Sequence, residues 1–122
     1  MTDDSTARSR VLLVEDEALI AMLMEDMLGD YQCEVFATVS RLDEAVAVAR
    51  SQSFDMAFID VNLNGVPAYP VADALGERGI PFAFVTGYGA AASDKKYTGV
   101  PVLQKPFRGH DLETIIQLLR SR

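Results

Sequence analysis

Short apolar runs alternate along the chain with longer segments in which apolar residues recur at helical spacing. Short runs rich in β-branched and aromatic residues are typical of buried strands, whereas spacings of three and four residues are typical of helices. The expected strands cover residues 11–14, 33–37, 56–59, 82–85 and 100–104. The expected helices cover residues 18–28, 41–50 with Ser40 as N-cap, 68–77, and the segment with Leu112, Ile115, Ile116 and Leu119. In residues 87–99, which hold three Ala and three Gly, we expect a short or mobile fourth helix.

The order of these elements predicts the fold class. Strands that alternate with helices and are joined by short loops form a parallel sheet with right-handed crossovers. We therefore expect a doubly wound α/β fold, with a flavodoxin-like five-stranded parallel sheet, strand order 2-1-3-4-5 and helices on both faces. Ligands of such sheets bind beside the carboxyl ends of the strands, so the functional residues are expected there.

Length and charge narrow the class of protein. The 122 residues match one ordinary domain, placed at residues 10–122 after a disordered tail at residues 1–9. A net charge of -7 disfavours the phosphate contacts on which nucleic-acid binding depends. Residues 1–10 are mostly polar and do not resemble a secretion signal, and no apolar stretch in the sequence approaches the roughly 18 residues expected of a membrane span. We expect a cytoplasmic protein that binds neither nucleic acid nor membrane, with its lone cysteine, Cys33, in the core.

Acidic residues follow two of the expected strands. Glu15 and Asp16 come directly after the first strand, and Asp60 ends the third. Three carboxylates at one edge of a sheet repel one another and raise each other's pKa unless a cation joins them. Mg²⁺ prefers carboxylate and carbonyl oxygens and needs only a few protein ligands. We predict a Mg²⁺ site formed by Glu15, Asp16 and Asp60, with a backbone carbonyl at Asn62 as a further ligand.

The same edge is expected to hold a hydroxyl group and an amine. Thr86 ends the fourth strand and Lys105 follows the fifth. The charges of Mg²⁺ and Lys105 balance three carboxylates, so the site can accept the charge of a phosphate. An Asp carboxylate can act as nucleophile in phosphoryl transfer. We predict that Asp60 is the phosphoacceptor and that the Thr86 hydroxyl donates a hydrogen bond to the phosphoryl group.

These residues resemble those of bacterial response-regulator receiver domains, over nearly the whole chain from Val11 to Leu119. The resemblance rests on Val-Glu-Asp-Glu at 14–17, Phe-Ile-Asp-Val-Asn-Leu at 58–63, a Thr that ends the fourth strand, and Lys-Pro-Phe at 105–107. It implies Asp60 as phosphoacceptor, Glu15 and Asp16 as Mg²⁺ ligands, and Thr86 and Lys105 as phosphate contacts. It also implies a histidine kinase or a histidine phosphotransfer protein as the phosphodonor.

Two departures from the common receiver pattern concern the signalling surface. Residues 81–89 resemble the FAT GUY subclass of single-domain response regulators, in which Gly follows the Thr and the fourth helix is atypical. Val102 stands where the common pattern has a switching Tyr or Phe. We hypothesise that Tyr88, or the segment that begins at Gly87, reports phosphorylation instead.

The remaining surface positions have simpler expectations. Leu19 and Met22 lie off the helix face defined by Ile20, Leu23 and Met27, so they form either a docking or dimer surface or extra burial under a neighbouring helix. Glu17 is expected to be a solvated loop residue, and His110 an exposed residue of the last helix.

Three functions are compatible with these residues. The favoured one is a phosphorylated switch that has no output domain, signals to a downstream protein partner, and catalyses only its own phosphorylation and dephosphorylation. The alternative is a receiver-like interaction module that works without phosphorylation. A Mg²⁺-dependent phosphohydrolase is disfavoured, because no acid lies two residues after Asp60 to serve as general acid.

Overall fold

The computed structural model describes residues 8–87 and 95–122, and its centre is a five-stranded parallel sheet. The strands lie in the order β2-β1-β3-β6-β7, and all four neighbouring pairs are parallel. Their bounds are β1 (Ser9–Val14), β2 (Cys33–Val39), β3 (Met56–Asp60), β6 (Phe82–Thr86) and β7 (Val102–Gln104). Numbered along the chain within this sheet, the order is 2-1-3-4-5, which confirms the predicted fold.

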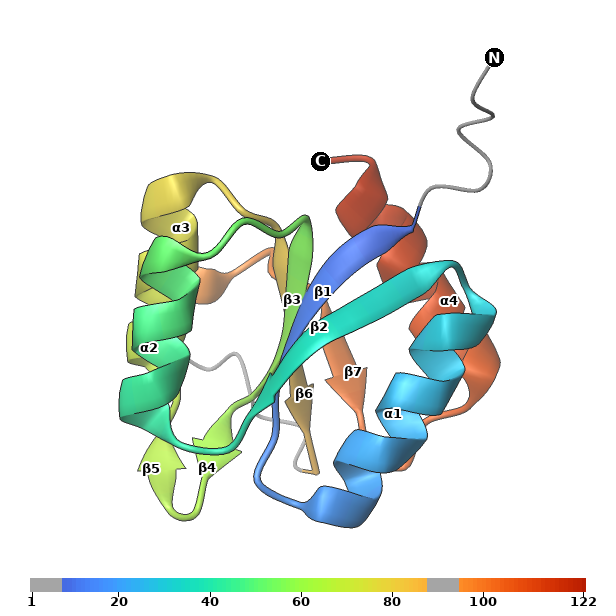
Figure 1. Cartoon of the computed structure of the whole chain (residues 1–122), viewed down its shortest axis with the longest axis horizontal. Coiled ribbons are helices and arrows are strands. Elements are labelled where there is room, and N and C mark those ends of the chain that lie inside the picture. Colours follow the sequence, from blue (N-terminus) through green and yellow to red (C-terminus); the bar gives the residue numbers. More distant parts are fainter. Residues whose placement is uncertain (1–7, 88–94) are drawn as a thin grey trace.

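Four helices in the described part of the chain cover the sheet. They are α1 (Ala18–Asp30), α2 (Leu42–Ser51), α3 (Tyr69–Arg78) and α4 (Gly109–Arg120). Helices α1 and α4 lie on one face and α2 and α3 on the other, with a short 3₁₀ turn, η2 (Lys95–Tyr97), between β6 and β7 (Figure 1). The carboxyl ends of the parallel strands all point to one edge, at the bottom of the view.

A small hairpin that the sequence analysis did not predict follows β3. Strands β4 (Asn62–Leu63) and β5 (Val66–Pro67) pair antiparallel through the two-residue loop Asn64-Gly65. Both loop residues have positive φ, 52° and 86°, the combination that a type I′ hairpin turn requires and that Asn-Gly favours. The Asn62 side-chain oxygen accepts a hydrogen bond from the Gly65 N–H (2.6 Å), which closes the hairpin beside Asp60.

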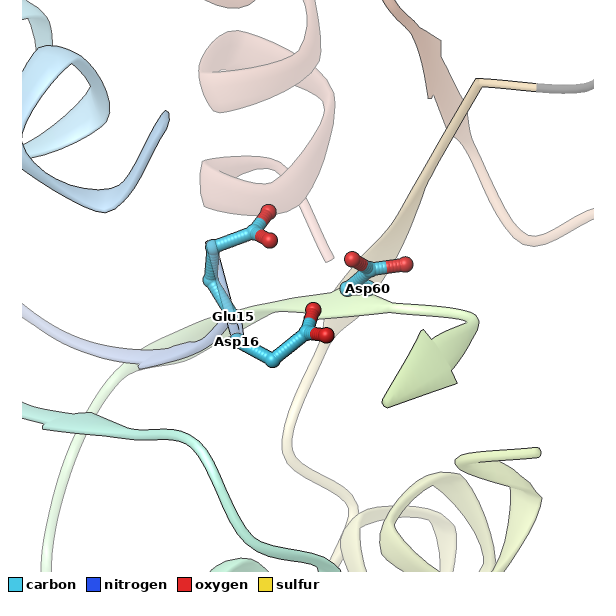
Figure 2. Close-up of side chains that lie close together, drawn as sticks. All are labelled: Glu15, Asp16 and Asp60. Carbon is cyan, nitrogen blue, oxygen red and sulfur yellow. The ribbon is translucent and has the colours of Figure 1, made fainter. Parts of the chain in front are cut away.

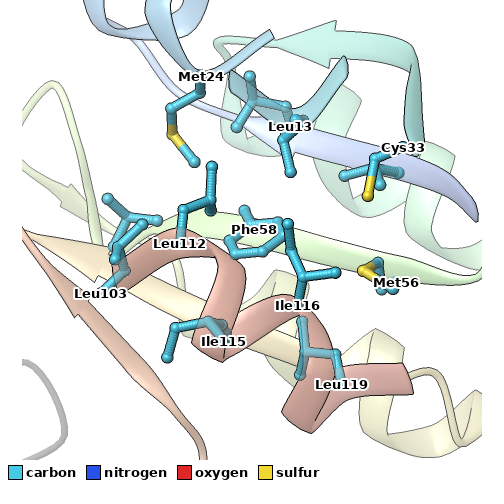
Figure 3. Packing of buried hydrophobic residues seen from close by; sticks show 14 of the residues in the cluster. Leu13, Met24, Cys33, Met56, Phe58, Leu103, Leu112, Ile115, Ile116 and Leu119 are labelled. Carbon is cyan, nitrogen blue, oxygen red and sulfur yellow. The ribbon is translucent and has the colours of Figure 1, made fainter. Parts of the chain in front are cut away.

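The core consists of two apolar clusters, one on each face of the sheet. The first lies between the sheet and α1 and α4, where Phe58 packs among Leu112, Ile115 and Ile116 (Figure 3). Cys33 is buried in the same cluster, as predicted. Every residue of β3 is buried, because this strand is covered by helices on both faces, and this explains its continuous apolar run.

The structure corrects the predicted face of the first helix. The buried residues of α1 are Ala21, Met24 and Leu28, whereas the Leu23 residue is 49% exposed. Ile20 and Met27, which share the predicted face with Leu23, are partly buried against the core. The buried face therefore runs through Ala21, Met24 and Leu28, and Leu23 lies at its edge.

The N-cap of α2 was also predicted wrongly. Strand β2 continues to Val39, so the chain turns into the helix only at Leu42, and Arg41 rather than Ser40 is the N-cap. Strand β7 begins at Val102, two residues later than expected, and β1 begins at Ser9, one residue before the predicted domain start. Tyr88 and the first seven residues of the predicted tail lie outside the described residues, so those predictions remain open.

Candidate functional site

The structure brings the predicted site residues together at the carboxyl edge of the sheet. Glu15 and Asp16 follow β1, Asp60 and Thr86 are the last residues of β3 and β6, and Lys105 follows β7. Within the described ranges, the buried polar or charged residues are Glu15, Asp60 and Thr86. Burying a polar or charged side chain costs free energy unless the group is compensated. Because the three buried polar residues gather at one edge of the sheet, we take this edge as the functional one.

Three carboxylates converge there. One oxygen each from Glu15, Asp16 and Asp60 lies within 4.8 Å of the others, and the three side chains turn toward a common point (Figure 2). One backbone N–H group orients each carboxylate. The Glu17 N–H donates to Glu15 Oε2 (3.0 Å), and the Asn64 N–H donates to Asp16 Oδ2 (3.1 Å). The Asn62 N–H donates to Asp60 Oδ1 (3.0 Å). The loop after β1 and the hairpin after β3 therefore hold the cluster in place.

The Lys105 ammonium completes the cluster. Its Nζ lies 3.1 Å from Glu15 Oε1 and 3.4 Å from Asp60 Oδ2. The Lys105 N–H donates to the Thr86 carbonyl (2.7 Å), which ties the end of β7 to the end of β6. Glu17 is exposed, as expected, but its Oε1 also lies 3.4 Å from Lys105 Nζ, a contact that the sequence did not indicate.

The burial of these charges perturbs their pKa values. Desolvation raises the pKa of Glu15 to about 7, and the nearby Asp60 charge adds to the effect, although the hydrogen bond from the Glu17 N–H and the neighbouring Lys105 ammonium oppose it. Burial by itself lowers the pKa of Lys105, but the negative charges of Asp60, Glu15 and Glu17 outweigh this effect and raise it. Lys105 is therefore a permanent cation at neutral pH, and Glu15 is held ionised only at a cost.

The donor set fits a hard divalent cation. Glu15 Oε1 is buried and accepts no hydrogen bond within the described residues; Lys105 lies beside it only as an ion pair. Three carboxylates and one ammonium leave two negative charges, which a divalent cation balances. Carboxylate oxygens in this arrangement suit Mg²⁺. The Asn62 carbonyl as a further ligand remains a prediction.

A pocket of about 400 Å³ opens beside the cluster. Asp60, Thr86 and Lys105 line it, together with Gly87 and Glu17. The pocket between β7 and α4 is larger, about 500 Å³, but it contains none of the buried polar residues. The smaller pocket is thus the one equipped for chemistry.

Helix α1, which begins two residues after Asp16, carries an exposed apolar patch. Leu19, Met22 and Leu23 are 81%, 62% and 49% exposed, so the alternative of extra burial for Leu19 and Met22 is wrong. We call these three residues the α1 patch. His110 is exposed, as expected. None of the helices within residues 8–87 and 95–122 combines the length and apolar composition that a bilayer span requires.

Comparisons with known proteins agree with this geometry. The chain is 29% identical to the transcriptional regulatory protein PdtaR of Mycobacterium tuberculosis, over 98% of this chain and 60% of PdtaR, so it spans about 60% of that relative's length. It is 38% identical to SdrG of Sphingomonas melonis Fr1, with a TM-score of 0.83 over 93% of this chain and 97% of SdrG.

Two further similar structures are of a BeF3-activated protein and of a magnesium-bound protein. The BeF3-activated conformation of SdrG, from Pseudomonas melonis Fr1, is 39% identical, with a TM-score of 0.78 over 93% of this chain and 98% of that one. The receiver domain of sensor histidine kinase PA1611 from Pseudomonas aeruginosa PAO1, which has magnesium coordinated in its active site cleft, shares the fold at 24% identity, with a TM-score of 0.80 over 95% of this chain and all of that one (100%). The response regulator receiver domain family matches residues 11–117, and the chain belongs to this family.

Proposed function

We propose that this receiver domain accepts a phosphoryl group on Asp60 from a histidine kinase or a histidine phosphotransfer protein. The observation that carries the proposal is the position of the Asp60 carboxylate. It is buried at the end of β3, faces the pocket, and lies between two further carboxylates and the Lys105 ammonium. The donor delivers its phosphoryl group through the pocket, and the phosphorylated protein signals to a downstream protein partner.

In the proposed reaction, a carboxylate oxygen of Asp60 attacks phosphorus as the bond from phosphorus to the donor's imidazole nitrogen breaks. The imidazole keeps the electron pair and leaves as neutral histidine, because its other ring nitrogen carries a proton in the phosphorylated donor. The Lys105 ammonium stabilises negative charge on the phosphoryl oxygens, and the Thr86 hydroxyl donates to one of them after transfer. Mg²⁺ held by the three carboxylates would neutralise further negative charge of the phosphoryl group. Attack by water on the phosphorus later restores Asp60 and releases phosphate.

Glu15, Asp16 and Asp60 are the proposed Mg²⁺ ligands, with the Asn62 backbone carbonyl as a fourth. Glu15 Oε1 is buried and accepts no hydrogen bond within the described residues, and the three carboxylates carry two negative charges that Lys105 does not balance. Both observations support a divalent cation here. The magnesium in the active site cleft of the PA1611 receiver domain, which has the same fold, agrees with this assignment.

We assign the chain to the FAT GUY subclass and place it in the cytoplasm. Support for the subclass comes from residues 81–87, where Gly87 follows Thr86 and lines the pocket. Val102 in β7 offers no aromatic ring for the usual switch. Tyr88 and the segment from Gly87 onward are the proposed reporters of phosphorylation.

The α1 patch is the proposed docking surface for the phosphodonor. Helix α1 begins directly after the residues of the metal cluster, so a protein bound to Leu19 and Met22 can reach the pocket. Exposed apolar side chains grouped beside a reactive site are typical of protein interaction surfaces.

Phosphoryl uptake tests the proposal. The protein is incubated with Mg²⁺ and a small-molecule phosphodonor, and intact mass is measured for wild type and Asp60→Asn. A Mg²⁺-dependent phosphoryl adduct on wild type alone is the expected result. A folded wild-type protein that takes up no phosphoryl group, from this donor or from candidate kinases, would favour the phosphorylation-independent interaction module.

A further inference from the structure

Glu17 is a third carboxylate on Lys105, and it lies outside the metal cluster. Its Oε1 is 3.4 Å from Lys105 Nζ, and the side chain is 63% exposed at the edge of the pocket. Its position is fixed, because Glu17 is the N-cap of α1 and its carbonyl accepts the Ala21 N–H (2.9 Å). The contact therefore follows from where α1 begins.

Three carboxylates surround the Lys105 ammonium. Its Nζ donates hydrogen bonds to Asp60 and Glu17, both at 3.4 Å, and lies 3.1 Å from Glu15 Oε1 as an ion pair. A phosphoryl oxygen that binds Lys105 therefore competes with these carboxylates for the ammonium.

The burial of each carboxylate determines which of the three is displaced from Lys105. Glu15 and Asp60 are almost completely buried, so each would become an uncompensated buried charge if it lost the ammonium. Glu17 can instead be hydrated by the surrounding water at small cost, because exposed ion pairs contribute little. Its negative charge also repels an approaching phosphoryl group, which carries negative charge of its own.

We propose that Glu17 competes with the phosphoryl group for Lys105 and so limits how readily the Asp60 site is occupied. The inference rests on the proposed function of that site and adds a regulating residue to it. Glu17 acts through Lys105, so it is a positioning residue: it holds the ammonium in the unoccupied site and releases it on phosphorylation.

The test is a titration with beryllofluoride in the presence of Mg²⁺, followed by amide NMR. Wild type is compared with Glu17→Gln and with Asp26→Asn, a control that removes one exposed charge from α1 without touching Lys105. Glu17→Gln is expected to bind about two- to fivefold more tightly than wild type, the change that one exposed ion pair supports. Asp26→Asn is expected to bind like wild type.

Glu17→Asp separates the contact from the charge. It keeps the negative charge but withdraws it by one methylene from Lys105, so it should retain most of the gain of Glu17→Gln. The ¹⁵N resonance of Lys105 Nζ gives a second readout: it should shift in Glu17→Gln and stay unchanged in Asp26→Asn.

The outcomes separate the inference from the proposed function. If wild type binds beryllofluoride but Glu17→Gln binds no more tightly than Asp26→Asn, the competition is refuted and the function of Asp60 stands. If Glu17→Asp matches wild type while Glu17→Gln gains, the long-range charge acts and not the contact, which also refutes the proposal. If wild type shows no binding, the proposed function itself fails.

Discussion

Replacing Glu15 with Gln is expected to stabilise the metal-free protein above neutral pH. The Glu15 residue is 2% exposed, and burial raises its pKa from 4.5 to about 7. The folded state therefore binds the Glu15 proton more tightly than the unfolded state. This contribution to stability is fully present below pH 4.5 and is lost as the pH rises to about 7 and beyond.

The pKa shift sets the size of the effect. A shift of about 2.5 units, from 4.5 to about 7, corresponds to about 3 kcal/mol at about 1.36 kcal/mol per unit. Gln keeps an oxygen that can accept the Glu17 N–H but gives up the ion pair with Lys105. The free energy of unfolding should therefore rise by about 1 to 3 kcal/mol at pH 8.

Urea unfolding with EDTA at pH 8 measures this change, and Glu17→Gln is the matched control. Glu17 also contacts Lys105 but is exposed, so its replacement should change the free energy of unfolding by less than about 0.5 kcal/mol. When Mg²⁺ replaces EDTA, wild type should gain more stability than Glu15→Gln, because the variant lacks a proposed ligand.

A Glu15→Gln protein that is less stable than wild type in EDTA at pH 8 would refute the reasoning. It would mean that Lys105 already compensates the buried charge in full. The metal-free cluster would then carry no electrostatic cost for a cation to relieve.

Two further predictions concern packing and docking. Gly76→Ala, in open space on α3, should raise the free energy of unfolding by about 0.5 to 1 kcal/mol, measured by urea unfolding. A lower value than that of wild type would contradict the open space around Gly76. Leu19→Ser combined with Met22→Ser should slow phosphotransfer from the kinase or phosphotransfer protein about tenfold while phosphorylation by a small donor is unchanged. Equal kinase rates would remove the α1 patch as the docking surface.

The fold and the residues that meet at the site could be predicted from the sequence, because both depend on where the buried strands lie along the chain and where each one ends. Buried strands of a parallel sheet appear as apolar runs, and the residue after each run must lie at the same edge as the others. Asp60 and Lys105 are 45 residues apart in sequence but meet for this reason. The small hairpin around Asn64-Gly65 was not predicted.

The details that failed depend on packing and side-chain reach. Leu23 is exposed because α1 packs through Ala21, Met24 and Leu28, and the spacing of apolar residues does not distinguish this face from the neighbouring one. The Glu17–Lys105 contact joins two loops through long side chains, and residue type and spacing carry no signal for it. Ser40 is a residue type that favours the N-cap position. However, β2 extends to Val39, so α2 begins at Leu42 and its N-cap is Arg41.

Locating the phosphorylated residue tests the central claim most directly. After phosphorylation in Mg²⁺, borohydride reduces an aspartyl phosphate to homoserine, and peptide mass spectrometry then identifies the modified position. The account predicts homoserine at position 60 and at no other acidic residue. Modification at Glu15 or Asp16, or a stable phosphate ester on a Ser or Thr, would contradict it.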